Sequence, residues 1–364
     1  MSVDRPPVEN RSGRGPHASI LDVAALADVS PSTVSRSLRG LPNVAPQTRQ
    51  RVLEAARELS YVVSPSASGL ASGQTRSIGV VVPFVTRWFF ANAVAGACDV
   101  LAEAGYDVLL YHLGSADARD RFFDRMPLAR RVDAVVTLTV PLTDDHTLGL
   151  RALGMPLVTV GAQMAGVTCV RIDDVTAAQS AVNHLVHQGH ESIAMLASLG
   201  EDPELGFSTS RDRREGYRRA MRTAGLEPRD DLLMAGSHGI DGGAEAMAQM
   251  LSGDILPTAL FAEYDEIAIG ALRTLRRAGI PVPGQISVVG VDDHEMASVV
   301  DLTTVAQQVH ELGAVAARLL LDTLAGGLQE PVDVVLPTRL MVRGSTGPPP
   351  SRQASRRPDP GAGG

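Results

Sequence analysis

Near the start of the chain the hydrophobic positions recur at spacings of three and four, which predicts two short helices joined by a tight turn. Ser19 is a good N-cap for the first helix, and Ser30 caps the second, with Pro31 at its first position. Val34 and Leu38 are four residues apart and are expected to pack against the first helix. That leaves Ser32, Thr33, Ser35 and Arg36 exposed at and near the N-terminus of the second helix.

A third helix is predicted from Pro46 to Ser60. Its buried stripe is expected to consist of Val52, Leu53, Ala56 and Leu59. Residues 62–76 follow and are rich in Ser and Gly, which are poor helix formers. Because an isolated helix of about two turns does not persist in water, this stretch is predicted to become helical only when a partner stabilises it.

From Arg76 onward, short apolar runs alternate with helical patterns. Strands are expected at Ile78–Val82, Val108–Tyr111, Ala134–Leu138, Leu157–Val160, Ile193–Leu196, Ala259–Phe261, Ile286–Val291 and Val332–Leu336. Helices are expected at 89–104, 177–187, 211–224, 242–251, 266–278 and 311–324. Continuous apolar strands between helices indicate parallel sheets covered on both faces, and two successive series indicate two doubly wound lobes.

Charge separates the two ends of the chain. The 364 residues include 44% apolar residues and carry a formal net charge of −8. Residues 1–77 hold nine Arg against six Asp or Glu, a charge of +3, which leaves −11 for the remainder. A basic end on an acidic body is typical of a DNA-binding head attached to a sensor.

Cysteine content and the N-terminal sequence bear on the compartment. Cys98 and Cys169 are the only cysteines, so neither a disulfide framework nor a cysteine metal site is expected. The N-terminus lacks the apolar core of a signal peptide, and no run reaches the ~18 apolar residues of a membrane span. The protein is therefore expected in the cytoplasm, away from membranes.

The predicted helical pair carries a specific string of residues. The string contains Asp22-Val23-Ala24, Val29-Ser30 and Thr33-Val34-Ser35-Arg36, and continues at Asn43-Val44, Thr48-Arg49 and Leu59-Ser60-Tyr61. It resembles the DNA-binding headpiece of the LacI/GalR family of bacterial transcription regulators, and the likeness covers about residues 19–343. The resemblance implies an N-terminal all-α helix-turn-helix headpiece plus an α/β periplasmic-binding-protein-like effector domain of two doubly wound lobes.

The resemblance also implies which residues bind DNA. The base-reading positions are held by Pro31, Ser32 and Arg36. Phosphate contacts are expected from Thr33, Ser35, Asn43 and Tyr61. Hydroxyls and an arginine near a helix N-terminus are suited to such contacts. Leu70 occupies the position of the leucine that the family inserts into the minor groove from a hinge helix, a wedge that kinks DNA.

Five segments are expected along the chain. Residues 1–18 form a polar lead-in and residues 344–364 a tail rich in Pro, Gly, Ser and Arg, and both are predicted to be disordered. Residues 19–61 form the helix-turn-helix domain, residues 62–76 the hinge, and residues 77–343 the effector-binding and dimerisation domain.

Ligands of open parallel sheets bind beyond the carboxyl ends of the strands. That rule selects Asp292, which follows a strand directly, and Arg213, near the start of the helix after the strand IAML. The same rule selects Glu263, Tyr264 and Asp265, which follow the strand ALF. It also selects an aromatic cluster after the first strand, made of Phe84, Trp88, Phe89 and Phe90. The cluster suits stacking on an apolar ring face, and packing of a helix on the core explains it equally well. Arg213 and Asp292 have the alternative of a structural ion pair.

Family motifs add to this selection. Arg-x-x-Gly-Tyr at 213–217 and Gly-Val-Asp at 290–292 match effector-binding positions, and Asp265 begins the matching string DEIAIGAL. The effector site is therefore expected at Phe89, Phe90, Arg213, Asp265 and Asp292. Asp173 and Asp174 are expected to cap a helix rather than touch the ligand.

Acidic groups and one arginine around aromatic rings suit a polyhydroxyl ligand, so a carbohydrate effector is expected, with a purine as the alternative. The chain is expected to act as a homodimer, or as a tetramer, that represses transcription from a near-palindromic double-stranded operator. Closure of the lobes on the effector would alter the affinity for DNA.

Other classes of protein fit less well. A sugar-binding protein related to transport components would explain the body but not the helix-turn-helix. An enzyme is not expected, because the sequence has no Gly-rich phosphate loop and no nucleophile elbow. A metal site at His184, His187 and His190 is not expected either, since Gly189 interrupts the helix and no carboxylate or cysteine sits at matching spacing. No cofactor is implied.

Overall fold

The computed structural model describes residues 18–61, 74–140, 142–198 and 208–351. The chain divides into two compact units, Met1–Thr75 and Arg76–Gly364, here called the head and the body. Leu70 and most of the predicted hinge lie outside the described residues. No helix in the described ranges combines the length and the apolar character needed to cross a membrane.

The head consists of three helices, α1 (Ile20–Ala27), α2 (Pro31–Leu38) and α3 (Pro46–Glu58). Ser19 forms a capping box, because its Oγ accepts from the Asp22 backbone N–H while the Asp22 carboxylate accepts from the Ser19 N–H at 2.8 Å. The three helices enclose a small core of Val23, Ala24, Ala27, Val34, Val52, Ala55 and Ala56. The helix-turn-helix predicted from residue spacing is thereby confirmed, with α3 ending two residues early.

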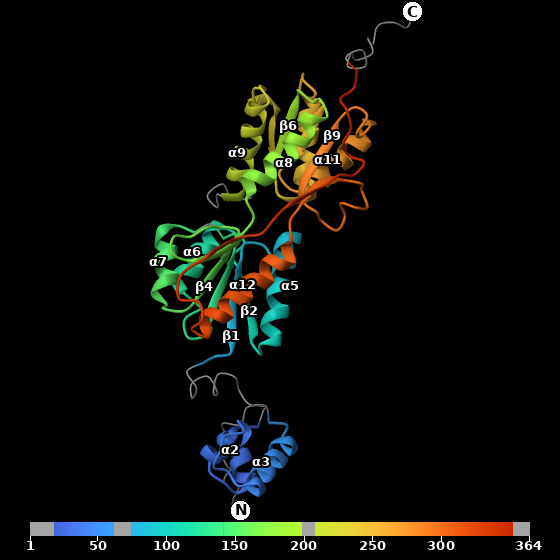
Figure 1. Cartoon of the computed structure of the whole chain (residues 1–364). Helices are drawn as coiled ribbons and strands as arrows, with labels where there is room; N and C mark the ends of the chain where they lie inside the picture. Colours follow the sequence, from blue (N-terminus) through green and yellow to red (C-terminus); the bar gives the residue numbers. More distant parts are fainter. Residues whose placement is uncertain (1–17, 62–73, 141, 199–207, 352–364) are drawn as a thin grey trace, which may run out of the picture. The chain divides into compact units, whose positions relative to one another are not determined.

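The first lobe of the body is built on a six-stranded parallel sheet in the order β11-β5-β4-β3-β1-β2 (Figure 1). Its strands are β1 (Ser77–Val82), β2 (Asp107–His112), β3 (Ala134–Leu138), β4 (Leu157–Val160), β5 (Thr168–Arg171) and β11 (Asp333–Val335). Its helices are α5 (Trp88–Glu103), α6 (Ala116–Arg125), α7 (Asp144–Ala152) and α12 (Val309–Leu324). Apolar clusters cover both faces of the sheet, which explains why β1 and β3 read as unbroken apolar runs.

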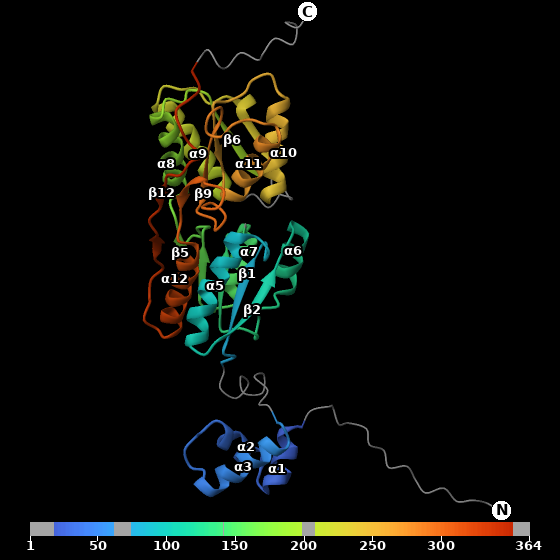
Figure 2. The same cartoon turned by 90° about the vertical axis from the view of Figure 1, so that its right-hand side faces the viewer.

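The second lobe repeats this plan with the order β12-β10-β9-β8-β6-β7, in which β12 alone runs antiparallel (Figure 2). Its strands are β6 (Ile193–Ser198), β7 (Leu233–Gly236), β8 (Ala259–Ala262), β9 (Ser287–Asp292), β10 (Thr303–Ala306) and β12 (Arg339–Met341). Its α-helices are α8 (Asp174–His187), α9 (Ser208–Thr223), α10 (Gly239–Ser252) and α11 (Asp265–Arg277). A short 3-10 turn, Asp230–Leu232, precedes β7.

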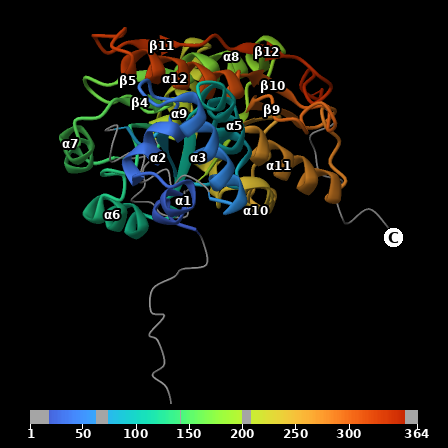
Figure 3. The same ribbon diagram turned by 90° about the horizontal axis from the view of Figure 1, so that it is seen from below.

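The two lobes are interleaved along the sequence. The chain passes between them after β5, after β10 and after β11, so that α12 and β11 complete the first lobe from the far end of the chain. Figure 3 shows β11 and β12 on one side of the body, beside α12 and α8. α12 lies against α5 so closely that a Cβ on Gly313 would meet the Ala93 carbonyl.

Two predictions about the chain require correction. The sequence reading missed the short strands β5, β7, β10 and β12, and the tail predicted to be disordered from Gly344 is ordered as far as Ser351. Ser345 is only 3% exposed, its Oγ donates to the Val288 carbonyl at 2.6 Å, and its own carbonyl accepts from the Val288 N–H. These bonds attach the start of the tail to the first residues of β9.

Candidate effector cleft and nucleic-acid interface

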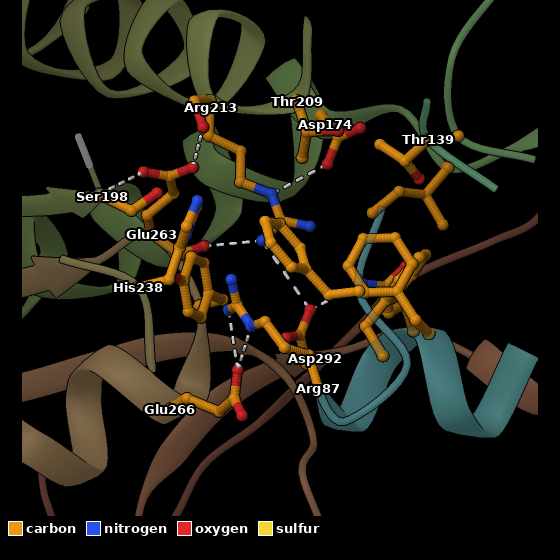
Figure 4. Close-up of a pocket in the computed structure, with 18 of the residues that line it drawn as sticks. Arg87, Thr139, Asp174, Ser198, Thr209, Arg213, His238, Glu263, Glu266 and Asp292 are labelled. Atoms are coloured by element: carbon orange, nitrogen blue, oxygen red, sulfur yellow. Dashed lines mark hydrogen bonds and ion pairs between the residues drawn. The ribbon is translucent and has the colours of Figure 1, made fainter. Parts of the chain in front are cut away.

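A cleft lies at the carboxyl ends of the strands of both lobes (Figure 4). The first lobe contributes Phe84, Arg87, Phe89, Phe90, Thr139, Gly161 and Leu312, and Arg171 and Ile172 lie at the crossing. The second lobe contributes Asp174, Ser198, Thr209, Ser210, Arg213, His238, Glu263, Tyr264, Glu266, Asp292 and Gln307. Because both lobes supply its walls, a bound molecule would link them.

Arg213 is the central cation of the cleft. It projects from α9, its Nε donates to Asp174 at 2.8 Å, and its Nη1 donates to the Glu263 carbonyl at 2.6 Å and lies 3.7 Å from Asp292. Burial acts to lower the pKa of Arg213, but Asp174 and Asp292 outweigh it and the pKa is raised. The guanidinium therefore stays charged and fixes the positions of three acceptors.

Asp292 ends β9 and is 7% exposed. Gln307 Nε2 donates to its Oδ1 at 2.6 Å, which orients the carboxylate toward the cleft side shared with Arg213. Burial raises the pKa of Asp292 to about 6, against the opposing effect of Arg213. The alternative expected for Arg213 and Asp292, an ion pair, is thus present within the cleft wall itself.

Glu263 is a second buried carboxylate and follows β8. It accepts from the Ser198 N–H at 3.0 Å and from the Ser210 hydroxyl. Burial raises the pKa of Glu263, while these hydrogen bonds act to lower it. Glu263 is therefore a hydrogen-bond acceptor whose position is fixed by Ser198 of β6 and Ser210 of α9.

Arg87 joins the two lobes at the cleft. It is the N-cap residue of α5, and its Nε and Nη2 donate to Glu266 of α11 at 3.1 and 2.7 Å. The same guanidinium lies 4.7 Å from the centre of the Tyr264 ring, a cation–π arrangement. The Tyr264 hydroxyl is 3.1 Å from Nδ1 of His238, and burial lowers the pKa of that histidine to about 4.

Aromatic rings form one wall of the cleft. Phe84 lies edge-on to Phe90 at 6.2 Å, Phe90 to Phe89 at 5.3 Å, and Phe84 is tilted against His238 at 5.5 Å. Three residues of the predicted aromatic cluster, Phe84, Phe89 and Phe90, thus line the cleft, and the cluster also packs on the core, of which Phe90 is a buried member. Trp88 is outside the cleft lining and packs on His294 at 4.9 Å.

The structure brings together four of the five residues expected to bind the effector: Phe89, Phe90, Arg213 and Asp292. It does not place Asp265 with them. Asp265 is 0% exposed, accepts from the Thr304 hydroxyl at 2.7 Å and from the His294 N–H at 2.8 Å, and so holds α11 against β10. The prediction for Asp265 is corrected accordingly.

The two aspartates expected to cap a helix differ. Asp173 caps α8, with its side chain accepting from the Thr176 N–H at 3.0 Å, as predicted. Asp174 instead lines the cleft and pairs with Arg213. The sequence reading also missed Arg87, Glu266 and other cleft residues in loops and first helical turns, where only their position after a strand could have selected them.

In the head, α2 presents the expected DNA-binding groups. Pro31, Ser32 and Arg36 are exposed, whereas Thr33 and Ser35 are half-buried. Ser30 caps the helix and its hydroxyl lies 2.8 Å from that of Ser32 and 2.9 Å from that of Thr33. These hydroxyls lie together at the N-terminus of α2, where backbone N–H groups and the helix dipole favour an anion such as a phosphate.

The other DNA-contact predictions fall in different settings. Asn43 is exposed in the loop before α3 with φ of 67°, a left-handed conformation that Asn tolerates. Tyr61 is half-buried and packs on the head core. Leu70 lies outside the described residues.

The three histidines considered for a metal do not converge on one point: the His190 ring bonds to Thr258 and to the Gly347 carbonyl at 2.9 and 2.8 Å.

A helix-turn-helix head attached to a two-lobed body with a polar cleft defines a class of protein, the transcription regulators whose DNA binding a small molecule controls. Two family profiles match: bacterial regulatory proteins of the lacI family over residues 19–64, and the periplasmic binding protein-like domain over residues 182–346. The chain belongs to the lacI family of bacterial regulatory proteins. The predicted resemblance and fold class are confirmed.

Individual relatives agree along almost the whole chain. Catabolite control protein A of Priestia megaterium is 32% identical over 91% of this chain and 99% of its own length. The structure of the regulator CelR in complex with cellobiose is 32% identical, covers 90% of this chain and all of that one, and has a TM-score of 0.66. A lac repressor dimer bound to operator is 28% identical, covers 91% and 99%, and has a TM-score of 0.80. The protein is a DNA-binding transcription regulator rather than an enzyme.

Proposed function

We propose that two copies of this chain pair to bind a near-palindromic operator, and that a carbohydrate in the cleft controls that binding. The observation that supports a carbohydrate effector is the composition of the cleft lining, in which buried carboxylates and an arginine lie beside aromatic rings. Sugar hydroxyls donate to carboxylates and accept from guanidinium groups, while the apolar face of a sugar ring packs on aromatic side chains. CelR, a similar protein, binds cellobiose in its solved structure.

Ligand binding would act on DNA through the relative position of the lobes. A molecule held by Asp292 and Arg213 of one lobe and Phe89 of the other favours the arrangement in which both contact it. The effector shifts the population of body conformations only by the difference between its affinities for them. In a dimer that difference reaches the paired hinges, which include Leu70, and so changes the affinity for the operator.

On the DNA, Pro31, Ser32 and Arg36 are proposed to face the bases. Their exposure on α2 supports this assignment, and a bidentate arginine–guanine contact is the commonest specific one. The half-buried Thr33, Ser35 and Tyr61, together with the exposed Asn43, are proposed to hold phosphates. Two heads related by a two-fold axis would read two half-sites in opposite orientation, which predicts the near-palindrome.

Pairing of two chains would use apolar surface that the single chain leaves exposed. Leu109 and Leu110 are 37% and 46% exposed on β2, the edge strand of the first lobe. Edge strands with exposed apolar side chains are favourable places for association. The similar lac repressor is a dimer on its operator.

Two measurements test the proposal. The first is a thermal-shift screen of sugars and nucleosides, because a ligand that binds the folded chain raises its melting temperature. The second selects duplexes from a random pool and measures their binding by fluorescence anisotropy with and without each hit. We expect a sugar to raise the melting temperature and to change the anisotropy midpoint. A nucleoside hit would favour the purine alternative, and a chain that selects no duplex would refute the DNA role.

A further inference from the structure

Each arginine that lines the cleft is paired with a carboxylate; for Arg87 and Arg213 the partner also lines the cleft, and for Arg171 it is Asp333 of β11. Arg87 pairs with Glu266 at 2.7 Å, Arg213 with Asp174 at 2.8 Å, and Arg171 with Asp333 at 2.8 Å. Glu263 and Asp292 remain as additional carboxylates in the lining. Among the described residues of the cleft wall, each arginine therefore already has a carboxylate partner.

The remaining ionisable groups of the cleft lining do not add the positive charge that an anion would need. Burial raises the pKa of both Glu263 and Asp292, and any negative charge that they carry adds to the acidic side of the balance. If both are taken as neutral, the three pairs still cancel. Burial lowers the pKa of His238 to about 4, so this ring is uncharged and adds no positive charge.

Two of these pairs, Arg87–Glu266 and Arg213–Asp174, are poorly screened by solvent, whereas the Arg171–Asp333 pair is more exposed. The side chains of Arg87 and Glu266 are 17% and 18% exposed, and those of Arg213 and Asp174 are 5% and 10% exposed. An anionic ligand would have to separate one of these pairs, or lie beside carboxylates with no cation of its own. A neutral polyol meets no such obstacle, since its hydroxyls both donate and accept.

We propose that the cleft binds uncharged polyhydroxyl molecules and rejects their carboxylated or phosphorylated counterparts, and that Glu266 determines this selectivity by occupying Arg87. This inference rests on the proposed carbohydrate-responsive function. Arg87 and Glu266 both line the cleft and come from opposite lobes, α5 and α11. Arg87 is also stacked on Tyr264, so it would keep its place if Glu266 lost its charge. Selectivity of this kind is set by the interaction that the wrong ligand cannot make.

The test is a calorimetric comparison of matched ligands on the full-length chain. The library holds neutral mono- and disaccharides, each with its uronic acid, aldonic acid and phosphate ester. We expect the tightest ligand of the wild type to be neutral and its acidic counterparts to bind at least about tenfold more weakly. Glu266→Gln releases Arg87 and should raise the ratio of acid to neutral affinity by at least about tenfold.

Two further variants isolate the cause. Arg87→Gln combined with Glu266→Gln removes the released cation and should return the ratio to the wild-type value. Asp241→Asn breaks the exposed Asp241–Arg273 pair, which lies outside the cleft in the same lobe, and should leave the ratio unchanged. Because the readout is a ratio, a general opening of the lobes in Glu266→Gln, which would weaken both ligands, does not imitate the expected result.

Each outcome decides a different point. A wild type that binds no member of the library refutes the proposed carbohydrate effector itself. A wild type whose tightest ligand is a uronic acid or a phosphate ester overturns the charge selectivity and leaves the carbohydrate effector intact. A Glu266→Gln variant that folds and binds the neutral ligand with an unchanged ratio removes Glu266 from the role of selecting residue.

Discussion

Replacing Arg213 with methionine would leave two buried carboxylates without their cation. The arginine side chain is 5% exposed, and it contacts Asp174 at 2.8 Å and Asp292 at 3.7 Å. Methionine preserves most of the side-chain volume, so the lost charge dominates the effect. Removing one member of a buried ion pair costs about 3–5 kcal/mol, and we expect the free energy of unfolding of the body to fall by about this amount near neutral pH.

The deficit should depend on pH in a defined direction. Burial raises the pKa of Asp174 and Asp292 in the wild type, and Arg213 opposes that rise. Without Arg213 both pKa values rise further above the value of about 3.9 in the unfolded chain. A carboxyl with a raised pKa in the folded state contributes stability at low pH, and this contribution is lost as the pH rises through the folded pKa. The deficit is therefore largest near about pH 7.5 and shrinks toward about pH 5.

Urea unfolding followed by tryptophan fluorescence measures this directly. Trp88, the single tryptophan, lies on α5 of the body and reports on that unit rather than on the head. Arg219→Met is the matched control, because Arg219 is an exposed residue of the same helix and pairs with Glu215 one turn away. A cost for Arg213→Met no larger than that of the control, or a deficit that stays constant between the two pH values, would refute the reasoning.

Four further outcomes are expected. Arg36→Ala should cost about 1–3 kcal/mol on the selected operator and little on random duplex, and equal losses in anisotropy would make Arg36 a phosphate contact. Leu70→Ala should reduce operator bending in a gel assay, and unchanged bending would exclude the wedge. Gly313→Ala should lower the free energy of unfolding of the body in urea by about 1–3 kcal/mol, since the new Cβ meets the Ala93 carbonyl. An unchanged free energy would mean that α5 and α12 can move apart without cost. Affinity for a neutral effector should fall as the pH drops through about 6, because Asp292 accepts hydrogen bonds as a carboxylate, and Asp292→Asn should flatten that calorimetric profile.

The sequence predicts the strands of the body where they are long and apolar. Ile78–Val82 and Ala134–Leu138 are buried on both faces and have no polar interruption, so the sequence predicts them well. Thr303–Ala306 was missed because two threonines begin it, although both are fully buried and hydrogen-bonded in the structure. A threonine suggests an exposed position in the sequence, because the acceptor that lets its hydroxyl be buried lies on a distant segment and is seen only in the structure.

The cleft shows the same limit. The residue after a strand is a good guide at Asp292, which ends β9 and turns its carboxylate to Gln307 and Arg213. It fails at Asp265, the first residue of α11, because the helix points that side chain back to Thr304. The pairing of Arg87 with Glu266 could not be predicted from the sequence, since the two residues belong to different lobes and only the folded chain brings them together.

The interleaved lobes also bear on how the protein is made. Helix α5 packs against α12, yet the chain between Glu103 and Leu324 must be synthesised before both helices exist. At about 5–20 residues per second, the ribosome needs about 10 to 40 seconds to supply that stretch. During this interval the first lobe lacks its covering helix and its outermost strand, and the apolar surface of α5 stays available to chaperones. A nascent chain of this regulator thus lacks the last strand of each lobe, β11 and β12, until the end of the body is synthesised.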